Sequence, residues 1–186
     1  MLTVGPAESR PLLPGRPKPA PTYVHIRIRQ AITEDAFAVT AILTDAAKWV
    51  EQLDGTTMWV EDELAQDRIA AEVDAGLFHV AECDGDIAGA LKFQLDDHLF
   101  WPDLATDDSA FIHRLAVRRN YAGQGVSAAL LGWAVDHARS LGKQSLRLDC
   151  DAERARLRDL YERFGFRLHS FRQVGSYYVA RYALDL

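Results

Sequence analysis

Residues 117–127 read VRRNYAGQGVS and hold the most informative pattern in the chain. An apolar, strand-like run ends at Val117, a short polar loop follows, and Gly123 and Gly125 precede a long helical pattern. Glycines at such a place let backbone amides approach an anionic group, and the start of a helix adds a partial positive charge. The segment therefore predicts a phosphate-binding loop, although two glycines also suit a plain turn before a helix.

Three designs of phosphate-binding loop can be compared with this segment. A Walker loop requires G-x-x-x-x-G-K-[ST], which the sequence lacks. The dinucleotide fingerprint G-x-G-x-x-G/A fits residues 123–128, and Asp149 follows near the end of the next strand. Its glycines normally follow their strand directly, however, and the 35 residues after Asp151 are too few for the rest of such a sheet. The third design is the pyrophosphate loop of acyl-CoA transferases.

Outward from this segment, strand and helix patterns alternate along the chain. Asp84-Gly85 predicts a hairpin, and Thr33-Glu-Asp predicts the start of the first helix, which stops at Gly55. Strand patterns cover residues 24–30, 77–83, 86–95, 110–117, 144–149, 166–172 and 176–184. Helical patterns cover residues 37–53, 61–75, 126–141 and 154–164. Hairpins mixed with strand–helix–strand crossovers predict an α/β domain whose mixed sheet has helices on both faces.

The composition is that of one ordinary globular domain. Of 186 residues, 48% are hydrophobic and 26% charged, and the formal net charge is −6. An acidic chain is a poor general binder of nucleic acid. The two cysteines, Cys83 and Cys150, form no C-x-x-C pair, and the pattern predicts no metal site or disulfide framework. No membrane span or signal segment is expected, so we expect a cytoplasmic protein.

The N-terminal residues differ from the rest of the chain. Six of the seven prolines fall within the first 21 residues. Because proline fixes φ and lacks an N–H, this stretch predicts neither a helix nor an inner strand. Residues 1–22 are therefore expected to be a disordered, proline-rich tail, and residues 23–186 the folded domain.

From Ile112 to Phe166 the sequence resembles the GNAT superfamily of N-acetyltransferases. The segments HRLAV, GQGVSAALL, LRLDC and LRDLYERFGF follow one another at the family's spacing. The element order agrees over residues 23–186, so the resemblance implies a GNAT-like α/β (α+β) domain with a mostly antiparallel, seven-stranded sheet. The family loop Q/R-x-x-G-x-G/A falls on residues 122–127, where Gly125 matches and Ala122 and Ser127 depart from the pattern.

The resemblance implies acetyl-CoA as cosubstrate and assigns residues to its binding. The fourth and fifth strands would splay apart, and the main chain at Leu115 and Val117 would pair with the pantetheine arm. Arg154 stands where many members carry an asparagine that touches CoA, and Arg118 and Arg119 are further candidates for its phosphates. The pyrophosphate would be held chiefly by the backbone amides of the loop formed by Ala122, Gly123, Gln124, Gly125, Val126 and Ser127.

The resemblance also assigns a catalytic role to Tyr161. It matches the family tyrosine that protonates the departing thiolate, while its place among Leu157, Leu160 and Phe164 also suits plain core packing. An attacking amine must lose a proton, and His113, on the strand beside the expected thioester, is the candidate general base. His79 is a weaker candidate on another strand.

The acceptor is left open as a primary amine on a small molecule or a peptide. Acidic residues of the loops would favour a cationic amine, or are simply solvated, and three tryptophans suit either the acceptor pocket or the core. These residues are Asp96, Asp97, His98, Asp107, Asp108, Trp49, Trp59 and Trp101. The alternative to an enzyme is a catalytically silent CoA-binding sensor or partner-binding module. The last strand, with Tyr177, Tyr178 and Tyr182, is expected at a sheet edge where a homodimer would form.

Overall fold

The computed structural model describes residues 25–55, 59–105 and 107–186. Seven strands of this part form one sheet in the order β1-β2-β3-β4-β5-β7-β6. The strands are β1 (Ile26–Gln30), β2 (Phe78–Cys83), β3 (Asp86–Gln94), β4 (Ser109–Val117), β5 (Ser145–Asp151), β6 (Arg167–Val174) and β7 (Tyr177–Asp185). The helices are α1 (Ala36–Asp54), α2 (Gln66–Asp74), α3 (Val126–Ser140) and α4 (Ala155–Phe164), with short 3₁₀ helices at Thr33–Asp35, Glu61–Leu64 and Arg119–Tyr121.

The sheet is mixed and mostly antiparallel, which confirms the predicted fold class. Only β4 and β5 run parallel among the strand pairs of the described residues. This topology excludes the dinucleotide-binding alternative, because that fold requires a mostly parallel, doubly wound sheet.

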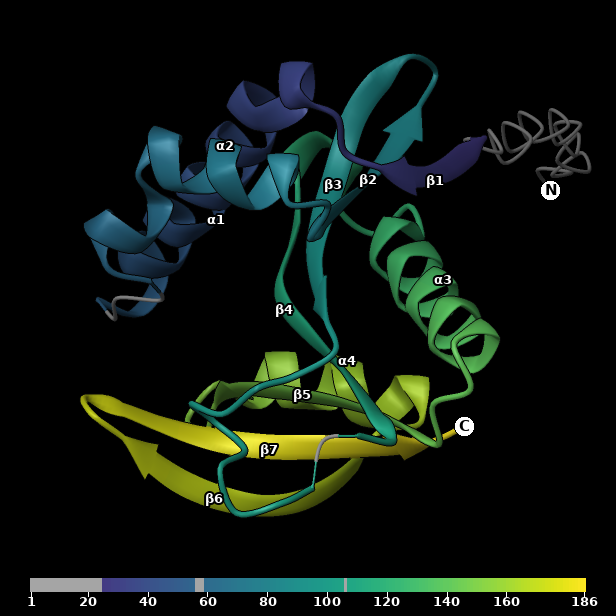
Figure 1. Ribbon diagram of the computed structural model, residues 1–186. Coiled ribbons are helices and arrows are strands. Elements are labelled where there is room, and N and C mark those ends of the chain that lie inside the picture. Colours follow the sequence, from purple (N-terminus) through teal and green to yellow (C-terminus); the bar gives the residue numbers. More distant parts are fainter. Residues whose placement is uncertain (1–24, 56–58, 106) are drawn as a thin grey trace, which may run out of the picture.

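Helices cover both faces of the sheet, as the sequence pattern predicted (Figure 1). On one face α1 and α2 pack through Val39, Ile42 and Ile69 onto Val80 and other apolar side chains of β2, β3 and β4. On the other face, apolar residues of α3, such as Leu130 and Leu131, pack onto β3, β4 and β5, and α4 packs nearby. Along β2 the side chains alternate between the two cores, as the pleat of a strand requires.

The sheet opens between its two parallel strands. β4 and β5 are paired only from Ser109 to Ile112 and from Ser145 to Leu148. Beyond these residues the strands diverge, which Figure 1 shows below the label β4. This divergence confirms the expected splay and leaves one side of β4 without a strand partner, while its other side stays paired with β3 at Ala116 and Val117.

Two expectations about elements are wrong. The last strand, β7, lies between β5 and β6, and Tyr182 on it is fully buried, so the sheet edges are β1 and β6. The helical pattern of residues 61–75 divides into a 3₁₀ helix and α2, because Ala65 adopts an extended ψ of 135° between them. Thr33 starts the 3₁₀ helix Thr33–Asp35, and its hydroxyl donates to Asp74.

The proline-rich tail expected at residues 1–22 lies outside the described residues. In the part of the chain that the structure describes, no helix combines the length and the apolar character needed to cross a membrane.

Candidate active site

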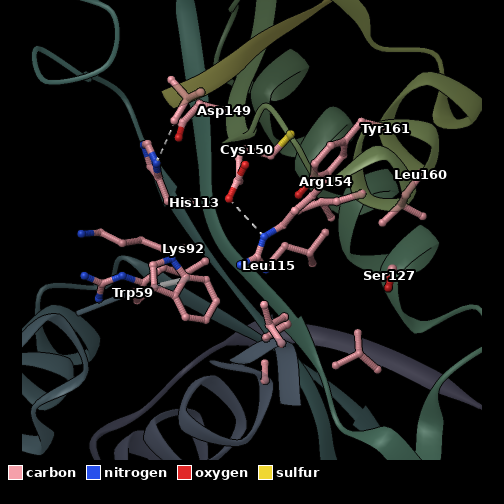
Figure 2. Close-up of a pocket in the computed structure, with 18 of the residues that line it drawn as sticks. Trp59, Lys92, His113, Leu115, Ser127, Asp149, Cys150, Arg154, Leu160 and Tyr161 are labelled. Carbon is pink, nitrogen blue, oxygen red and sulfur yellow. Dashed lines mark hydrogen bonds and ion pairs between the residues drawn. The ribbon is translucent and has the colours of Figure 1, made fainter. Parts of the chain in front are cut away.

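A large pocket lies where β4 and β5 separate. Its walls come from α1, the ends of β3 and β4, the loop before α3, the start of α4 and the β6–β7 turn. Most residues that the sequence singled out line this pocket: His113, Leu115, Val117, Ala122, Gly123, Gly125, Val126, Ser127, Arg154 and Tyr161. Figure 2 shows several of these side chains around the opening.

At one end of the pocket the loop leads into the N-terminus of α3. Gly125 is the N-cap with φ 86° and ψ 0°, a left-handed conformation that glycine adopts without steric cost. No side chain caps the helix at this position, so the first amides of α3 remain available to an anion. Gln124 does not line the pocket, because its side-chain amide donates to the carbonyl of Asn120.

The arginines near this end have different roles. Arg118 donates from Nε to the carbonyl of Ile87 at 2.7 Å and does not line the pocket. Arg119 lines it, with its guanidinium carbon 3.9 Å from the centre of the Trp49 ring. On the opposite wall Arg154, at the N-cap of α4, lies 3.3 Å from the carboxylate of Asp151. Arg119 and Arg154 therefore bring positive charge to the pocket.

Tyr161 belongs both to the core and to the pocket. It is 5% exposed, packs against Phe166 and Tyr182, and still lines the opening. Burial raises the pKa of its phenol well above the usual range, so the hydroxyl keeps its proton at neutral pH. Cys150 lines the same pocket, and burial raises its thiol pKa to about 12. A thiol that stays protonated is a poor nucleophile.

His113 lies between two carboxylates. Its Nε2 is 3.5 Å from Oδ2 of Asp97, and its Nδ1 is 3.6 Å from Oδ1 of Asp149 (Figure 2 shows the second pair). Asp97 is only 7% exposed, and its Oδ1 accepts hydrogen bonds from the amides of Leu99 and Phe100. The facing oxygens, Oδ2 of Asp97 and Oδ1 of Asp149, are buried and have no hydrogen-bond partner among the described residues.

Burial shifts the pKa of all three groups, and it raises that of Asp97. It lowers the pKa of His113 to about 3, with help from the charges of Lys92 and Arg114. It raises the pKa of Asp149 to about 8, with help from Asp97. At neutral pH the imidazole is therefore neutral and Asp149 carries a proton. The three side chains also lie close enough to share a metal ion. However, each ring nitrogen of His113 faces a different carboxylate, which suits a proton relay better than a shared ion.

Two cationic side chains that sequence reasoning missed lie next to His113. Lys92 is opposite His113 in the register of β3 and β4, and Arg114 follows His113 directly. Both line the pocket and contact Glu72 of α2. Arg114 has a φ of 50°, and the register of β4 shifts beside it, so residues 113, 114 and 115 all line the pocket. Regular strand alternation would have predicted Arg114 on the face opposite His113, and nothing in the sequence indicates the bulge.

Several other expected site residues lie elsewhere. His79 does not line the pocket; its ring centroid lies 3.9 Å from that of Trp133, and burial lowers its pKa to about 4. Trp101 is fully buried beside Phe111 and belongs to the core. Asp107 and Asp108 do not border the pocket. Trp49, Trp59, Asp96, Asp97 and His98 do line it.

Comparisons with known proteins agree on one family. Residues 40–166 match the model of the acetyltransferase (GNAT) family. An uncharacterized N-acetyltransferase, YesJ of Bacillus subtilis strain 168, is 32% identical over 142 residues, which are 73% of this chain and 78% of YesJ.

Solved structures share the fold. A GNAT-family acetyltransferase from Listeria monocytogenes superposes with a TM-score of 0.70 at 24% identity and covers 87% of this chain and 95% of its own. The PaiA N-acetyltransferase of Thermoplasma acidophilum, solved with coenzyme A, gives a TM-score of 0.68 at 17% identity, covering 84% and 98%.

Proposed function

The chain belongs to the acetyltransferase (GNAT) family and is an acetyl-CoA-dependent acyltransferase, and from this premise we propose that it acetylates a primary amine by direct transfer. The amine nitrogen attacks the thioester carbonyl, a C–N bond forms, and the C–S bond to CoA breaks. The buried Cys150 thiol supports direct attack, because it stays protonated at neutral pH and is therefore a poor nucleophile for a covalent intermediate.

Acetyl-CoA is proposed to enter between the diverging strands. The unpaired side of β4 at Leu115 and Val117 would pair with the pantetheine arm as an added strand. The loop from Ala122 to Ser127 would hold the pyrophosphate through its amides, and the backbone near Val117 would polarise the thioester carbonyl. Arg119 and Arg154 would face the CoA phosphates. The coenzyme A bound by the Thermoplasma relative supports this assignment by analogy of fold.

His113 is proposed as the general base that takes the proton of the attacking amine. The low pKa of His113 keeps its imidazole neutral at physiological pH and therefore able to accept a proton, although the same low pKa makes it a weak base. Asp97 would stabilise the imidazolium that forms transiently, and the protonated carboxyl of Asp149 would help to hold the ring in place.

Tyr161 is proposed as the general acid that protonates the departing CoA sulfur. A phenol with a raised pKa would be a weak acid toward a thiolate in water, where the corresponding thiol has a pKa of about 8.5. Burial penalises the thiolate for the same reason that it penalises the phenolate, however, so both pKa values rise together. The Tyr161 phenolate then takes up a proton from solvent, which reaches it through the open pocket.

One observation carries this proposal: Tyr161 and His113, the latter with its two carboxylates, line the same opening between β4 and β5. The test is steady-state kinetics with acetyl-CoA and a panel of primary amines. Tyr161→Phe and His113→Gln are each expected to lower kcat by roughly 10²- to 10⁴-fold, the usual contribution of a general acid or base. Stabilisation by acetyl-CoA should persist in both.

A matched control is His25→Gln, which makes the same chemical change at an exposed position. It should leave kcat unchanged. Full activity in Tyr161→Phe would contradict its role as acid, and full activity in His113→Gln would contradict its role as base. Binding of acetyl-CoA without acetylation of any amine would favour the silent module over the enzyme.

A further inference from the structure

We propose that the acceptor amine carries a carboxylate a few bonds from its nitrogen, as an α-amino acid does, and that Lys92 and Arg114 bind this carboxylate. The inference rests on the proposed function, because it takes the amine to lie beside His113.

Lys92 and Arg114 both contact the carboxylate of Glu72. Nζ of Lys92 lies 2.8 Å from Oε1 of Glu72, and Nη1 of Arg114 lies 2.8 Å from its Oε2. The side chains of Lys92, Arg114 and Glu72 are 12%, 9% and 14% exposed. A third cation, Arg68, places its Nε 3.8 Å from the same Oε1. Glu72 therefore balances only part of the positive charge gathered around it.

Glu63, the other carboxylate that acts on Arg114, does not remove this surplus. Glu63 acts on Arg114 electrostatically, and its carboxylate accepts a hydrogen bond from the hydroxyl of Tyr177. Counting Glu63 and Glu72 against Arg68, Lys92 and Arg114 still leaves one positive charge. Burial lowers the pKa of Arg114, which is the sign of an incompletely compensated buried cation. A further carboxylate would offset that cost.

Arg114 has donors left for such a carboxylate. Its Nη1 is bonded to Glu72, while Nε and Nη2 have no hydrogen-bond partner within the described ranges. A guanidinium offers its N–H groups as a planar fork that matches a carboxylate in two parallel hydrogen bonds. Arg114 adopts a left-handed backbone with a φ of 50°, and its side chain lines the pocket.

The cationic pair lies beside the proposed base. Lys92 faces His113 across the β3–β4 ladder, and Figure 2 shows both at the same side of the opening. Both cations lower the pKa of His113, so they are close enough to act on it. In an α-amino acid the nitrogen and the carboxyl carbon are attached to the same carbon. A carboxylate on Lys92 and Arg114 would therefore hold the amine next to His113.

Three acidic residues at the His113 end of the pocket do not favour a polycationic acceptor instead. Asp97 uses Oδ1 for two backbone amides and turns Oδ2 to His113. Asp149 keeps its proton at neutral pH. Asp96 is exposed at the rim. The remaining walls include Trp59, Phe100 and Tyr177, which suit an apolar side chain on the acceptor.

The test compares matched ligands on the full chain saturated with CoA. Phenylalanine, phenylalaninamide and phenethylamine share one amine and one ring, but only the first carries a carboxylate; leucine, leucinamide and isopentylamine form a second set. Calorimetric affinities are measured for the wild type, Lys92→Met, Lys92→Gln and Lys48→Met. Lys48 is exposed on α1 and makes the matched control. Thermal stabilisation by acetyl-CoA shows that each variant is folded.

The acid is expected to bind at least 10-fold more tightly than its amide or amine. Either change of Lys92 should reduce acid affinity by roughly 10- to 100-fold, the range of one charge-assisted hydrogen bond, and leave the amines unaffected. Lys48→Met should behave as wild type. Equal affinity for the three ligands of each set, no binding of either acid, or no effect at Lys92 overturns the inference.

Turnover of the same ligands with acetyl-CoA separates the two claims. Acetylation of amines without preference for the acids would leave the proposed function standing and overturn the inference. Tight binding of the acids without acetylation of any amine would uphold the carboxylate site and count against the proposed catalysis.

Discussion

Asp149 is the residue whose protonation most affects the site. It follows the part of β5 that pairs with β4, its side chain is 11% exposed, and its Oδ1 has no hydrogen-bond partner among the described residues. Its pKa of about 8 in the folded chain exceeds the ordinary value near 4. Between these values the folded protein keeps a proton that the unfolded chain releases, so this group makes stability fall as pH rises.

The titration of His113 changes the free energy of unfolding in the opposite direction over part of this pH range. Its folded pKa of about 3 lies below the ordinary value near 6.5, so it makes stability rise with pH between them. The two effects offset each other up to about pH 6.5, and above it only the effect of Asp149 remains.

We therefore expect the free energy of unfolding to fall between about pH 6.5 and 8, by up to about 1.4 kcal/mol per pH unit. Asp149→Asn should flatten the profile in this window, whereas Asp185→Asn, an exposed control on β7, should not. Urea unfolding at a series of pH values measures this. A wild-type profile that is flat from pH 6.5 to 8 would show that Asp149 is ionised in the folded chain.

At the scale of elements, sequence reasoning succeeded where a pattern is local. The glycines before α3, the hairpin at Asp84-Gly85 and the apolar stripes of the helices are local patterns, and these elements formed within a few residues of the expected bounds. It failed at the bulge of β4. In a regular strand Arg114 would face away from the pocket, so its place in the lining could not be predicted from the sequence. The meeting of Asp97 and Asp149 at His113 was also missed, because it depends on how a long loop folds over the sheet.

The start of α3 gives a test with a control in the same helix. Gly125→Ala should cost about 1 to 2 kcal/mol, because φ is 86° there although no atom obstructs a Cβ. Gly132, in the middle of α3, has an unobstructed Cβ position and no positive φ. Gly132→Ala should be neutral or stabilise by up to about 1 kcal/mol.

The two substitutions should also differ in ligand binding. Gly125→Ala should weaken acetyl-CoA binding more than its loss of stability alone would, because it would turn the amides that we propose hold the pyrophosphate. Gly132→Ala should not weaken it. Chemical unfolding and calorimetry on both variants provide the measurements. Unchanged acetyl-CoA affinity in Gly125→Ala would argue against the pyrophosphate assignment.

At the scale of the whole molecule, the opened sheet needs support away from the opening. Arg181 of β7 is 4% exposed and forms two hydrogen bonds with the carboxylate of Asp103, in the loop between β3 and β4. It also donates to the carbonyl of Phe100. This loop carries Asp97 to His113, so the pair connects the C-terminal strands to the site.

Asp103→Asn should lower the free energy of unfolding by about 1 to 2 kcal/mol, below the cost of breaking a fully buried pair because Asp103 is 43% exposed. Arg181 lowers the pKa of Asp103 to about 2. Its contribution is therefore present above about pH 4 and is lost as pH falls through about 2. Asp107→Asn, an exposed change in the same loop, is the control. Equal stability of the two variants would contradict this role.

For the whole molecule, the sequence predicted the fold class correctly but predicted the wrong strand at the edge of the sheet. The family motifs and the alternation of elements specified a mixed, seven-stranded sheet. They did not show that β7 inserts between β5 and β6, because a final hairpin can place either of its strands at the edge. The aromatic residues of β7 therefore belong partly to the core, with Tyr182 fully buried.

The central claim is that the opening between β4 and β5 binds acetyl-CoA. Thermal unfolding with acetyl-CoA, CoA or NADH in excess tests it most directly. At 100 times its Kd a ligand stabilises the native state by about 2.7 kcal/mol, or several degrees in a chain of this size. We predict this shift with acetyl-CoA and CoA, a smaller one in Gly125→Ala, and none with NADH. No shift with either CoA species would contradict the account.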